Sequence, residues 1–229
     1  PFQAVEQVKA VLNVYHSIGG QVTSHPTNPN EYEYDSEVDL VATTDSHWEF
    51  TGWVGNGVVD PNSLSTKVIM SEDRNVTATF KLKEYNITLK TNPEGVGSVT
   101  GAGTGFNHGA TAIISATAPF GYEFSHWSNF DSDGQPTTGL DDNESASTTL
   151  TVGGGHIVFA NFQPLPFNIS VNSTLGGNAT IIESSPFYYD QAYTLSASSE
   201  YGYTFQQWSS STGSDSLISS KTSNISTFS

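Results

Sequence analysis

Apolar residues recur at every second position in several short segments of this chain. Val38, Leu40 and Ala42 form one such segment, and the pattern returns at residues 76–80 and 112–116. Turn-forming residues, chiefly Gly, Pro, Asn and Asp, separate the segments. Alternation with period two is typical of a β-strand with one buried face, and no segment sustains the 3.6-residue period of an amphipathic helix. We therefore predict an all-β protein.

An eleven-residue spacing between an alanine and a tryptophan occurs three times, and a phenylalanine stands three residues before each of these tryptophans. Because a tandem unit must repeat its packing, we expect residues that recur at one spacing to lie in the core of each unit rather than at a ligand site. The predicted core residues are Ala42, Phe50 and Trp53, then Ala116, Phe124 and Trp127, then Ala197, Phe205 and Trp208.

Aligned on this spacing, the chain divides into three modules, at 11–85, 86–166 and 167–229, preceded by an N-terminal extended segment, 1–10. Each of the first two modules ends with an alternating strand, at 76–80 and at 158–162. In the third module, Ile225 and Phe228 align with the strand before that one, and the sequence then ends. We therefore expect the third module to lack its last strand within this chain.

The order Gly-Gly-x-Val, Val-x-Leu-x-Ala, Gly-Tyr-x-Phe-x-x-Trp and Val-x-Ala-x-Phe resembles the divergent internalin-type B-repeat. The first module departs from it at His47-Trp48, which replaces Gly-Tyr. The resemblance implies small β-grasp-like or β-sandwich-like modules in secreted or cell-surface proteins that serve as spacers, stalks and adhesive parts. It implies no common catalytic residues. The residues that carry it include Gly19, Gly20, Val22, Val38, Leu40, Gly97, Val99, Gly121, Tyr122, Gly176, Gly177, Gly202 and Tyr203.

The composition narrows the classes of partner. The formal net charge is −16 with seven Lys plus Arg, which argues against nucleic acid and anionic membranes because both require basic patches. No apolar run is long enough to cross a membrane. The chain contains no Cys, so the core, a metal or a neighbouring module must stabilise each small module. It starts at Pro1 without Met or a signal peptide, and we expect a processed form or a fragment.

An acidic loop in the second module is a candidate calcium site. Hard cations bind several carboxylate and carbonyl oxygens, although the full EF-hand pattern is absent here and a solvated loop is the alternative interpretation. The acidic residues of this loop are Asp131, Asp133, Asp141, Asp142 and Glu144.

Other chemistry is weakly indicated. The six His share no metal-ligand spacing, and no Gly-x-Ser-x-Gly elbow is present, so we expect no enzyme and no required cofactor. Asn-x-Ser/Thr sequons mark sites where N-linked glycans could be attached if the protein is extracellular. These sequons begin at Asn75, Asn86, Asn143, Asn168, Asn172, Asn178 and Asn224.

The N-terminal segment suggests a mechanism of assembly. A β-module that lacks one strand exposes unpaired backbone and an open core. Apolar residues near the N-terminus alternate much like the last strand of the complete modules: Phe2, Ala4, Val8, Ala10 and Leu12. Insertion of this donor strand into the third module of the next subunit would be a head-to-tail contact, which builds an open filament. We therefore expect a homopolymer, an extracellular filament or stalk at the cell surface.

Two alternatives remain open. The chain could be cut from a longer array, with Val11 and Leu12 simply beginning the first module. It could instead be a carbohydrate-binding or adhesion module that binds a cell-surface glycan through exposed Trp or Tyr. Aromatic residues outside the repeated spacing are those most expected at the surface or in contacts between modules; they are Tyr32, Phe120, Phe130, Phe187, Tyr188 and Tyr201.

Overall fold

The computed structural model describes residues 8–25, 30–189, 191–212 and 215–228. These residues form β-strands and no α-helix, with one 3-10 turn, η1 (Asp215–Leu217), so the predicted all-β class is confirmed. Within them we find no helix with the length and apolar character that a membrane span requires. The chain forms two compact units, one of Pro1–Ile87, Gly103–Thr111 and Thr151–His156, the other of Thr88–Ala102, Ala112–Leu150 and Ile157–Ser229.

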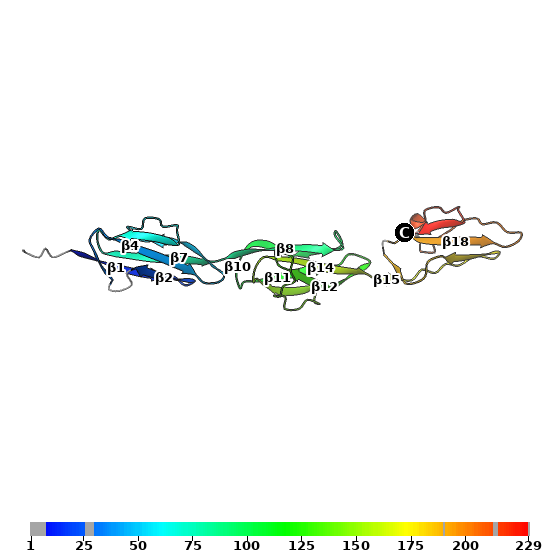
Figure 1. Cartoon of the computed structure of the whole chain (residues 1–229). Helices are drawn as coiled ribbons and strands as arrows, with labels where there is room; N and C mark the ends of the chain where they lie inside the picture. Colours follow the sequence, from blue (N-terminus) through cyan, green and yellow to red (C-terminus); the bar gives the residue numbers. More distant parts are fainter. Residues whose placement is uncertain (1–7, 26–29, 190, 213–214, 229) are drawn as a thin grey trace, which may run out of the picture. The chain divides into compact units, whose positions relative to one another are not determined.

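The first repeat lies within the first unit and consists of two sheets (Figure 1). One has the order β3-β1-β7-β5 and the other the order β2-β4-β6. Strands β1 and β7 are parallel neighbours, whereas β1–β3, β5–β7, β2–β4 and β4–β6 are antiparallel. The strands are β1 (Lys9–His16), β2 (Gly20–His25), β3 (Glu31–Glu33), β4 (Glu37–Thr44), β5 (Trp48–Val54), β6 (Ser65–Ile69) and β7 (Arg74–Leu82).

The alternating residues of the two sheets meet in one core. Val38 and Leu40 of β4 and Val76 and Ala78 of β7 are fully buried, and they belong to the same hydrophobic cluster. Successive side chains of a strand point to opposite faces, so alternation in the sequence places every second residue of each strand in this cluster. Burial of the Val and Leu side chains stabilises the module by about 1.5–3 kcal/mol each.

The second repeat has the same strand order, in sheets β10-β8-β14-β12 and β13-β11-β9. In the second unit, Ile114, Leu150, Val158 and Ala160 are fully buried. The strands are β8 (Glu84–Asn92), β9 (Ser98–Thr100), β10 (Gly103–Asn107), β11 (Thr111–Thr117), β12 (Tyr122–Phe130), β13 (Ser147–Thr151) and β14 (His156–Pro164).

The third repeat keeps one of the two sheets in the same order, β16-β18-β19, and pairs β15 with β17. Within the residues that the structure describes, it has no counterpart of β7 or β14. Residues 203–208, which correspond to β5 and β12, form no strand there. The reason is that β5 and β12 pair with β7 and β14 respectively. The strands are β15 (Pro166–Phe167), β16 (Gly177–Ile181), β17 (Phe187–Tyr188), β18 (Tyr193–Ser199) and β19 (Ile225–Phe228).

Candidate functional site

The repeated alanine and tryptophan hold one loop of each repeat, which we call the clamped loop. In the first repeat it runs from Pro61 to Leu64 and leads into β6. Trp53 donates twice, from its backbone N–H to the Pro61 carbonyl at 2.7 Å and from its indole Nε1–H to the Ser63 carbonyl at 2.8 Å. The Ala42 N–H donates to the Leu64 carbonyl at 2.8 Å.

The same three bonds recur in the other two repeats. In the second, Trp127 donates from its backbone to Asn143 at 2.7 Å and from its indole to Ser145 at 2.9 Å, and Ala116 donates to Ala146 at 2.8 Å. In the third, Trp208 donates to Lys221 at 2.8 Å and to Ser223 at 2.9 Å, and Ala197 donates to Asn224 at 2.8 Å. All the acceptors are backbone carbonyls, so the loop residues themselves need not be alike.

A buried hydroxyl adds a fourth bond that sequence reasoning missed. In the first repeat the Asp60 N–H donates to Oγ1 of Thr66 at 3.0 Å, and Thr66 is buried. The equivalent bonds join Asp142 to Thr148 at 3.0 Å and Ser220 to Ser226 at 2.9 Å. In every repeat a Thr or Ser stands six residues after the donor, and this recurrence could have indicated the bond. Ser and Thr are so common in this chain that the recurrence does not stand out in the sequence.

The nine residues predicted as core lie in or against the hydrophobic interior. Trp53, Trp127 and Trp208 are 4%, 2% and 7% exposed. The others are buried (Ala42) or half-buried (Phe50, Ala116, Phe124, Ala197 and Phe205). The repeated spacing is therefore a structural device, in which one aromatic side chain both fills the interior and fixes a loop.

The joint between the first and second repeats lies within the first unit. The His47 and His108 rings stack with centroids 3.6 Å apart and planes 2° apart. The His47 carbonyl accepts a bond from the N–H of Lys83, the one residue between β7 and β8, at 2.8 Å. The Lys83 carbonyl accepts from the His108 N–H at 3.0 Å.

The joint between the second and third repeats lies within the second unit and uses equivalent positions. Gly121 corresponds to His47, and its carbonyl accepts from the N–H of the linker residue Leu165 at 2.8 Å. Tyr189 corresponds to His108. A Cβ added to Gly121 would lie 2.4 Å from Cγ of Tyr189, so the ring rests directly on the glycine backbone. Phe120 and Tyr122 meet the Tyr189 ring edge-on.

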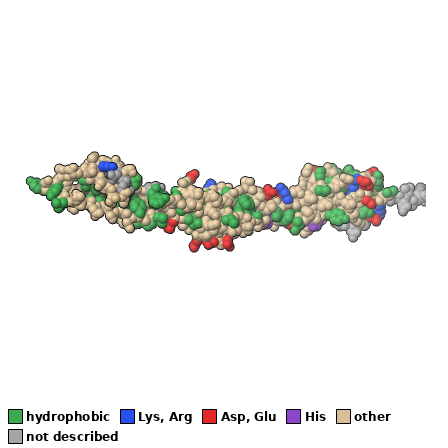
Figure 2. All heavy atoms as spheres, turned by 180° about the vertical axis from the view of Figure 1, so that it is seen from behind, with side chains coloured by type: hydrophobic (Ala, Val, Ile, Leu, Met, Phe, Trp, Pro, Cys, Tyr) green, Lys and Arg blue, Asp and Glu red, His purple; other side chains and the backbone are tan. Residues whose placement is uncertain are grey.

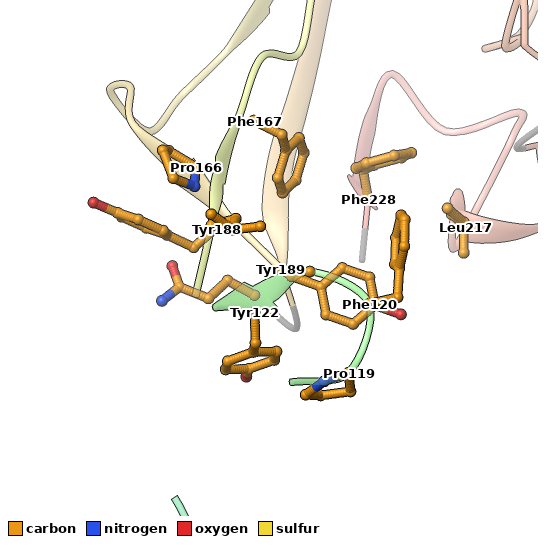
Figure 3. A pocket seen from close by; sticks show the side chains of 12 residues that line it. Pro119, Phe120, Tyr122, Pro166, Phe167, Tyr188, Tyr189, Leu217 and Phe228 are labelled. Atoms are coloured by element: carbon orange, nitrogen blue, oxygen red, sulfur yellow. The ribbon is translucent and has the colours of Figure 1, made fainter. Parts of the chain in front are cut away.

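A cavity of about 730 Å³ opens at this second joint. Figure 3 shows the rings of Phe120, Phe167 and Phe228 among the side chains around it. Phe228 occupies the position that Val68 has in the first repeat and Leu150 in the second. Met70 and Val152, which follow Val68 and Leu150 by two residues, are both fully buried. The residues that line the cavity are mostly apolar or aromatic, so it suits an apolar group better than a polar ligand.

A second hollow, of about 200 Å³, runs beside β16 in the third repeat; we call it the third-repeat groove. Its walls include Gly177, Ala179 and Phe205. In the first repeat the position of Gly177 is Gly20, where an added Cβ would lie 2.5 Å from the Phe80 ring of β7. In the second it is Gly97, with the Phe162 ring of β14 at 2.6 Å. At Gly177 the nearest atoms are backbone atoms of Ser198 and Ser199, with no ring among them.

Comparison with known families agrees with this geometry. The divergent InlB B-repeat domain matches three segments, 10–84, 87–166 and 167–229, which together span nearly the whole chain. This chain is a tandem array of divergent InlB B-repeats. Domains of this family are typically associated with the cell surface. No individually curated protein matches the chain.

The acidic loop of the second B-repeat uses its carboxylates to cap its own backbone. Oδ1 of Asp131 accepts from the N–H groups of Asp133 and Gln135 at 3.0 and 2.8 Å. Oδ1 of Asp142 accepts from the Glu144 N–H at 2.9 Å. Asp60 makes the same contact with Asn62 in the first B-repeat, at 3.0 Å. Among the described residues, no group of three or more His, Asp or Glu could hold a metal ion, so the structure does not bring the loop's acids, Asp141 included, together as ligands.

The titratable groups of the B-repeats that depart from ordinary behaviour are few in the described part of the chain. Burial lowers the pKa of His156, whose Nε2 accepts from the Gly153 N–H at 3.3 Å. Hydrogen bonds from the backbone and hydroxyl of Thr194, at 2.7 and 2.8 Å, lower the pKa of the exposed Glu183. A hydrogen bond to Glu37 raises the pKa of Lys67 on the surface. Acidic side chains outnumber basic ones on the face shown in Figure 2.

All seven predicted sequon asparagines are exposed in the structure, so each is accessible to a modifying enzyme. They occur on all three B-repeats: Asn75, Asn86, Asn143, Asn168, Asn172, Asn178 and Asn224.

Two predictions about surface residues need correction. Tyr32 and Phe187 are 6% exposed and lie at equivalent places, in β3 and β17, so they are core rather than surface residues. Phe120 and Tyr201 are exposed as expected, while Phe130 and Tyr188 are half-buried. The three tryptophans of the repeated spacing are buried and cannot serve as exposed glycan platforms.

The predicted donor strand is also partly wrong. Ala10 and Leu12 are 2% and 3% exposed, because they belong to β1, which pairs with β3 and β7 of the first B-repeat. They are therefore not free to enter another molecule. Val8 is 67% exposed and precedes this strand. Phe2 and Ala4 lie outside the described residues.

Proposed function

We propose that this chain is a structural protein of the cell surface, without enzymatic activity, whose B-repeats join end to end into a filament or stalk. Residues 1–7 of one copy would pair as a β-strand in the third-repeat groove of another copy. The observation that carries this proposal is the hollow beside Gly177, where Phe80 and Phe162 lie in the other two repeats.

The route of the chain into the first repeat supports residues 1–7 as the donor. The Lys83 carbonyl accepts from the His108 N–H at 3.0 Å at the first joint, and the Val8 carbonyl accepts from the Tyr34 N–H at the same distance. Val8 thus stands where a linker residue stands between two repeats. Since β7 and β14 end one residue before their linkers, a strand that preceded Val8 in the same way would comprise residues 1–7.

Such pairing would offset a specific cost. Residues 172–174 and 203–208, which border the third-repeat groove, belong to no strand, so their backbone donors and acceptors have no sheet partners. Strand addition supplies main-chain hydrogen bonds along the groove, and pockets for alternate side chains supply specificity. In this register Val5 takes the place of Phe80 and Phe162 and offers an apolar side chain to the hollow beside Gly177, whereas Phe2 and Ala4 fall on the other face of the strand. Because the donor and the acceptor are different surfaces, each added copy leaves one of each free, and growth is open-ended.

The test uses a peptide that already fits an equivalent groove. A peptide with the sequence of β7 (Arg74–Leu82) is added in excess to the full chain, beside a scrambled peptide of the same composition. We expect concentration-dependent polymers by analytical ultracentrifugation and electron microscopy, which the β7 peptide shortens and the scrambled peptide does not. A second arm replaces residues 1–7 by seven Gly and Ser residues, which keeps the length and removes the apolar side chains. This variant should be monomeric.

Polymers that form equally well with the replaced segment would overturn strand donation by residues 1–7. A chain that stays monomeric at every concentration while binding the β7 peptide would retain the groove and overturn the filament. Loss of the groove is checked separately with Ala179→Asp, which places a charge at its wall, against Thr180→Asp, an exposed position of β16 that does not line the groove. Both proteins are made in a host without N-glycosylation, since Asn178 begins a sequon.

We also propose that the exposed sequons carry N-linked glycans in the native host. A polar coat on all three repeats would add to the repulsion that a net charge of −16 already provides between the sides of neighbouring chains. Mass spectrometry of the native protein after glycosidase treatment in oxygen-18 water tests this. Conversion of the sequon Asn residues to labelled Asp supports the proposal, and unmodified Asn at all seven sites contradicts it.

A further inference from the structure

The two joints inside the chain use one set of positions. The first partner lies five residues after the repeated alanine of the preceding repeat, at His47 and Gly121. The second lies eight residues before the repeated alanine of the following repeat, at His108 and Tyr189. Each internal joint therefore pairs the first kind of position in one repeat with the second kind in the next. One position of each kind takes part in neither joint.

The two remaining positions are Tyr34 of the first repeat and Gly202 of the third. Tyr34 is 52% exposed. At Gly202, whose φ is +85°, an added Cβ would meet nothing within 4 Å, in contrast to Gly121, which the Tyr189 ring covers. The neighbours Tyr201 and Tyr203 are 103% and 50% exposed, and Leu175 at the adjoining turn is 88% exposed. The first repeat thus presents an exposed tyrosine, and the third repeat presents an uncovered glycine flanked by apolar side chains.

We propose that Tyr34 of one copy packs on Gly202 of a second copy and forms a third joint of the same kind; this rests on the proposed end-to-end assembly. Tyr34 takes the place of Tyr189, and Gly202 takes the place of Gly121. The Gly202 carbonyl of the second copy accepts from the Val8 N–H of the copy that supplies Tyr34, as the Gly121 carbonyl accepts from the Leu165 N–H at 2.8 Å. The glycine matters because a side chain there would occupy the space that the ring needs.

The second joint shows why this partner fits better than an unrelated apolar molecule. There the ring of Tyr189 lies on the glycine while the rings of Phe120 and Tyr122 meet it edge-on, an arrangement that aromatic rings favour. Tyr201 and Tyr203 are the equivalents of Phe120 and Tyr122. Gly202 and its two neighbouring tyrosines can therefore surround a tyrosine ring of another copy in the way that Gly121, Phe120 and Tyr122 surround Tyr189.

Charge sets the conditions under which the contact forms. Each copy carries a net charge of −16, while the residues that meet at this joint are uncharged. Salt screens repulsion between the copies with a Debye length of about 10 Å at 0.1 M, and it leaves the packing of rings on backbone little changed. The third joint should therefore strengthen as salt is raised, whereas a contact based on ion pairs would weaken.

Cysteine cross-linking tests the contact directly, because the chain contains no Cys. Chains with Tyr34→Cys are mixed with chains with Gly202→Cys under mild oxidation at two salt concentrations. The double variant Gly121→Cys with Tyr189→Cys reports the internal joint as a positive control. The matched negative pair is Tyr34→Cys with Asn143→Cys, which is exposed but lies away from any joint position. We expect the Tyr34–Gly202 pair to form mixed disulfides about tenfold faster or more than the negative pair, because assembly raises the effective concentration of the two thiols.

The outcomes separate this inference from the proposed function. Normal polymers with a cross-linking rate no higher than that of the negative pair would overturn the Tyr34–Gly202 joint and leave strand donation standing. Selective cross-linking in chains whose residues 1–7 are replaced by Gly and Ser would support the joint and overturn its dependence on strand donation. Neither polymers nor selective cross-links would overturn both. Gly202→Leu, which fills the place of the ring without a thiol, should shorten the polymers, and Asn143→Leu should not.

Discussion

Trp127→Phe removes one hydrogen-bond donor from the clamped loop and retains an aromatic ring in the core. Trp127 is 2% exposed, and its Nε1–H donates to the Ser145 carbonyl at 2.9 Å. Loss of this bond costs about 1 kcal/mol net. The smaller ring leaves a void of roughly 40 Å³, which adds about 1 kcal/mol at ~24 cal/mol per Å³. The loop should therefore be held about 2 kcal/mol less tightly.

Hydrogen exchange measures this effect at the bonds themselves. The backbone N–H groups of Trp127 and Ala116 donate to the same loop, at 2.7 and 2.8 Å, so their exchange rates report its opening. A loss of about 2 kcal/mol corresponds to about thirtyfold faster exchange, since 1.4 kcal/mol is a factor of ten. Global denaturation is a poorer assay because a chain of several modules need not unfold in one step.

The matched control is Trp48→Phe, which also exchanges indole for phenyl but changes a ring that covers Gly19 and takes no part in the clamp. It should leave exchange at Ala116 and Trp127 unchanged. If Trp127→Phe leaves exchange at these two amides within about threefold of wild type, the lost bond and the void together cost less than about 0.7 kcal/mol, and the hydrogen-bond explanation of the repeated spacing is wrong.

Three further predictions follow from the joints and the interior. Gly121→Ala should destabilise the second joint by about 1–2 kcal/mol, because φ there is +84° and the added Cβ meets Tyr189; limited proteolysis near Leu165 should speed up while the repeats themselves stay folded. Thr148→Val should cost about 1–2 kcal/mol by leaving the Asp142 N–H without its acceptor, measured as faster exchange of that amide. Burial lowers the pKa of His156, so the unfolded chain binds the proton more readily and stability should fall as the pH drops from about 6.5 through the lowered pKa; His156→Gln should flatten this part of the melting-temperature curve.

The strands and the core of each repeat were accessible from the sequence because both depend on side chains. Alternation at Val38, Leu40 and Ala42 reflects one buried face, and the spacing from Ala42 to Trp53 reflects a shared packing geometry. The burial of Tyr32 and Phe187 also had a signal that was missed. An aromatic residue stands ten positions before the repeated alanine in all three repeats, with Phe106 in the second, so these residues belong to the repeated pattern.

The groups that complete the clamp could not be predicted in this way. The loop offers backbone carbonyls, and the residues that supply them, such as Pro61, Asn143 and Lys221, have nothing in common as side chains. The error at Ala10 and Leu12 has a related cause. Alternation shows that a segment is a strand with one buried face, but not which sheet it joins, and the parallel pairing of β1 with β7 appears only in three dimensions.

The joints show how one backbone geometry tolerates different chemistry. At the first, two histidine rings stack, and at the second a tyrosine ring lies on a glycine, yet in both the linker N–H donates to the preceding repeat at 2.8 Å. The clamp inside each repeat has no such freedom, because a single tryptophan must both fill the core and reach two carbonyls. Substitutions at joint positions should therefore change how firmly neighbouring repeats are held, whereas substitutions in the clamp should change whether a repeat folds. A ring paired with a ring, or a ring paired with a glycine, satisfies the joint, but two large side chains that cannot stack would not. By the same reasoning Gly202, which faces Tyr34 in the proposed contact between copies, should accept a large side chain as poorly as Gly121 does beneath Tyr189.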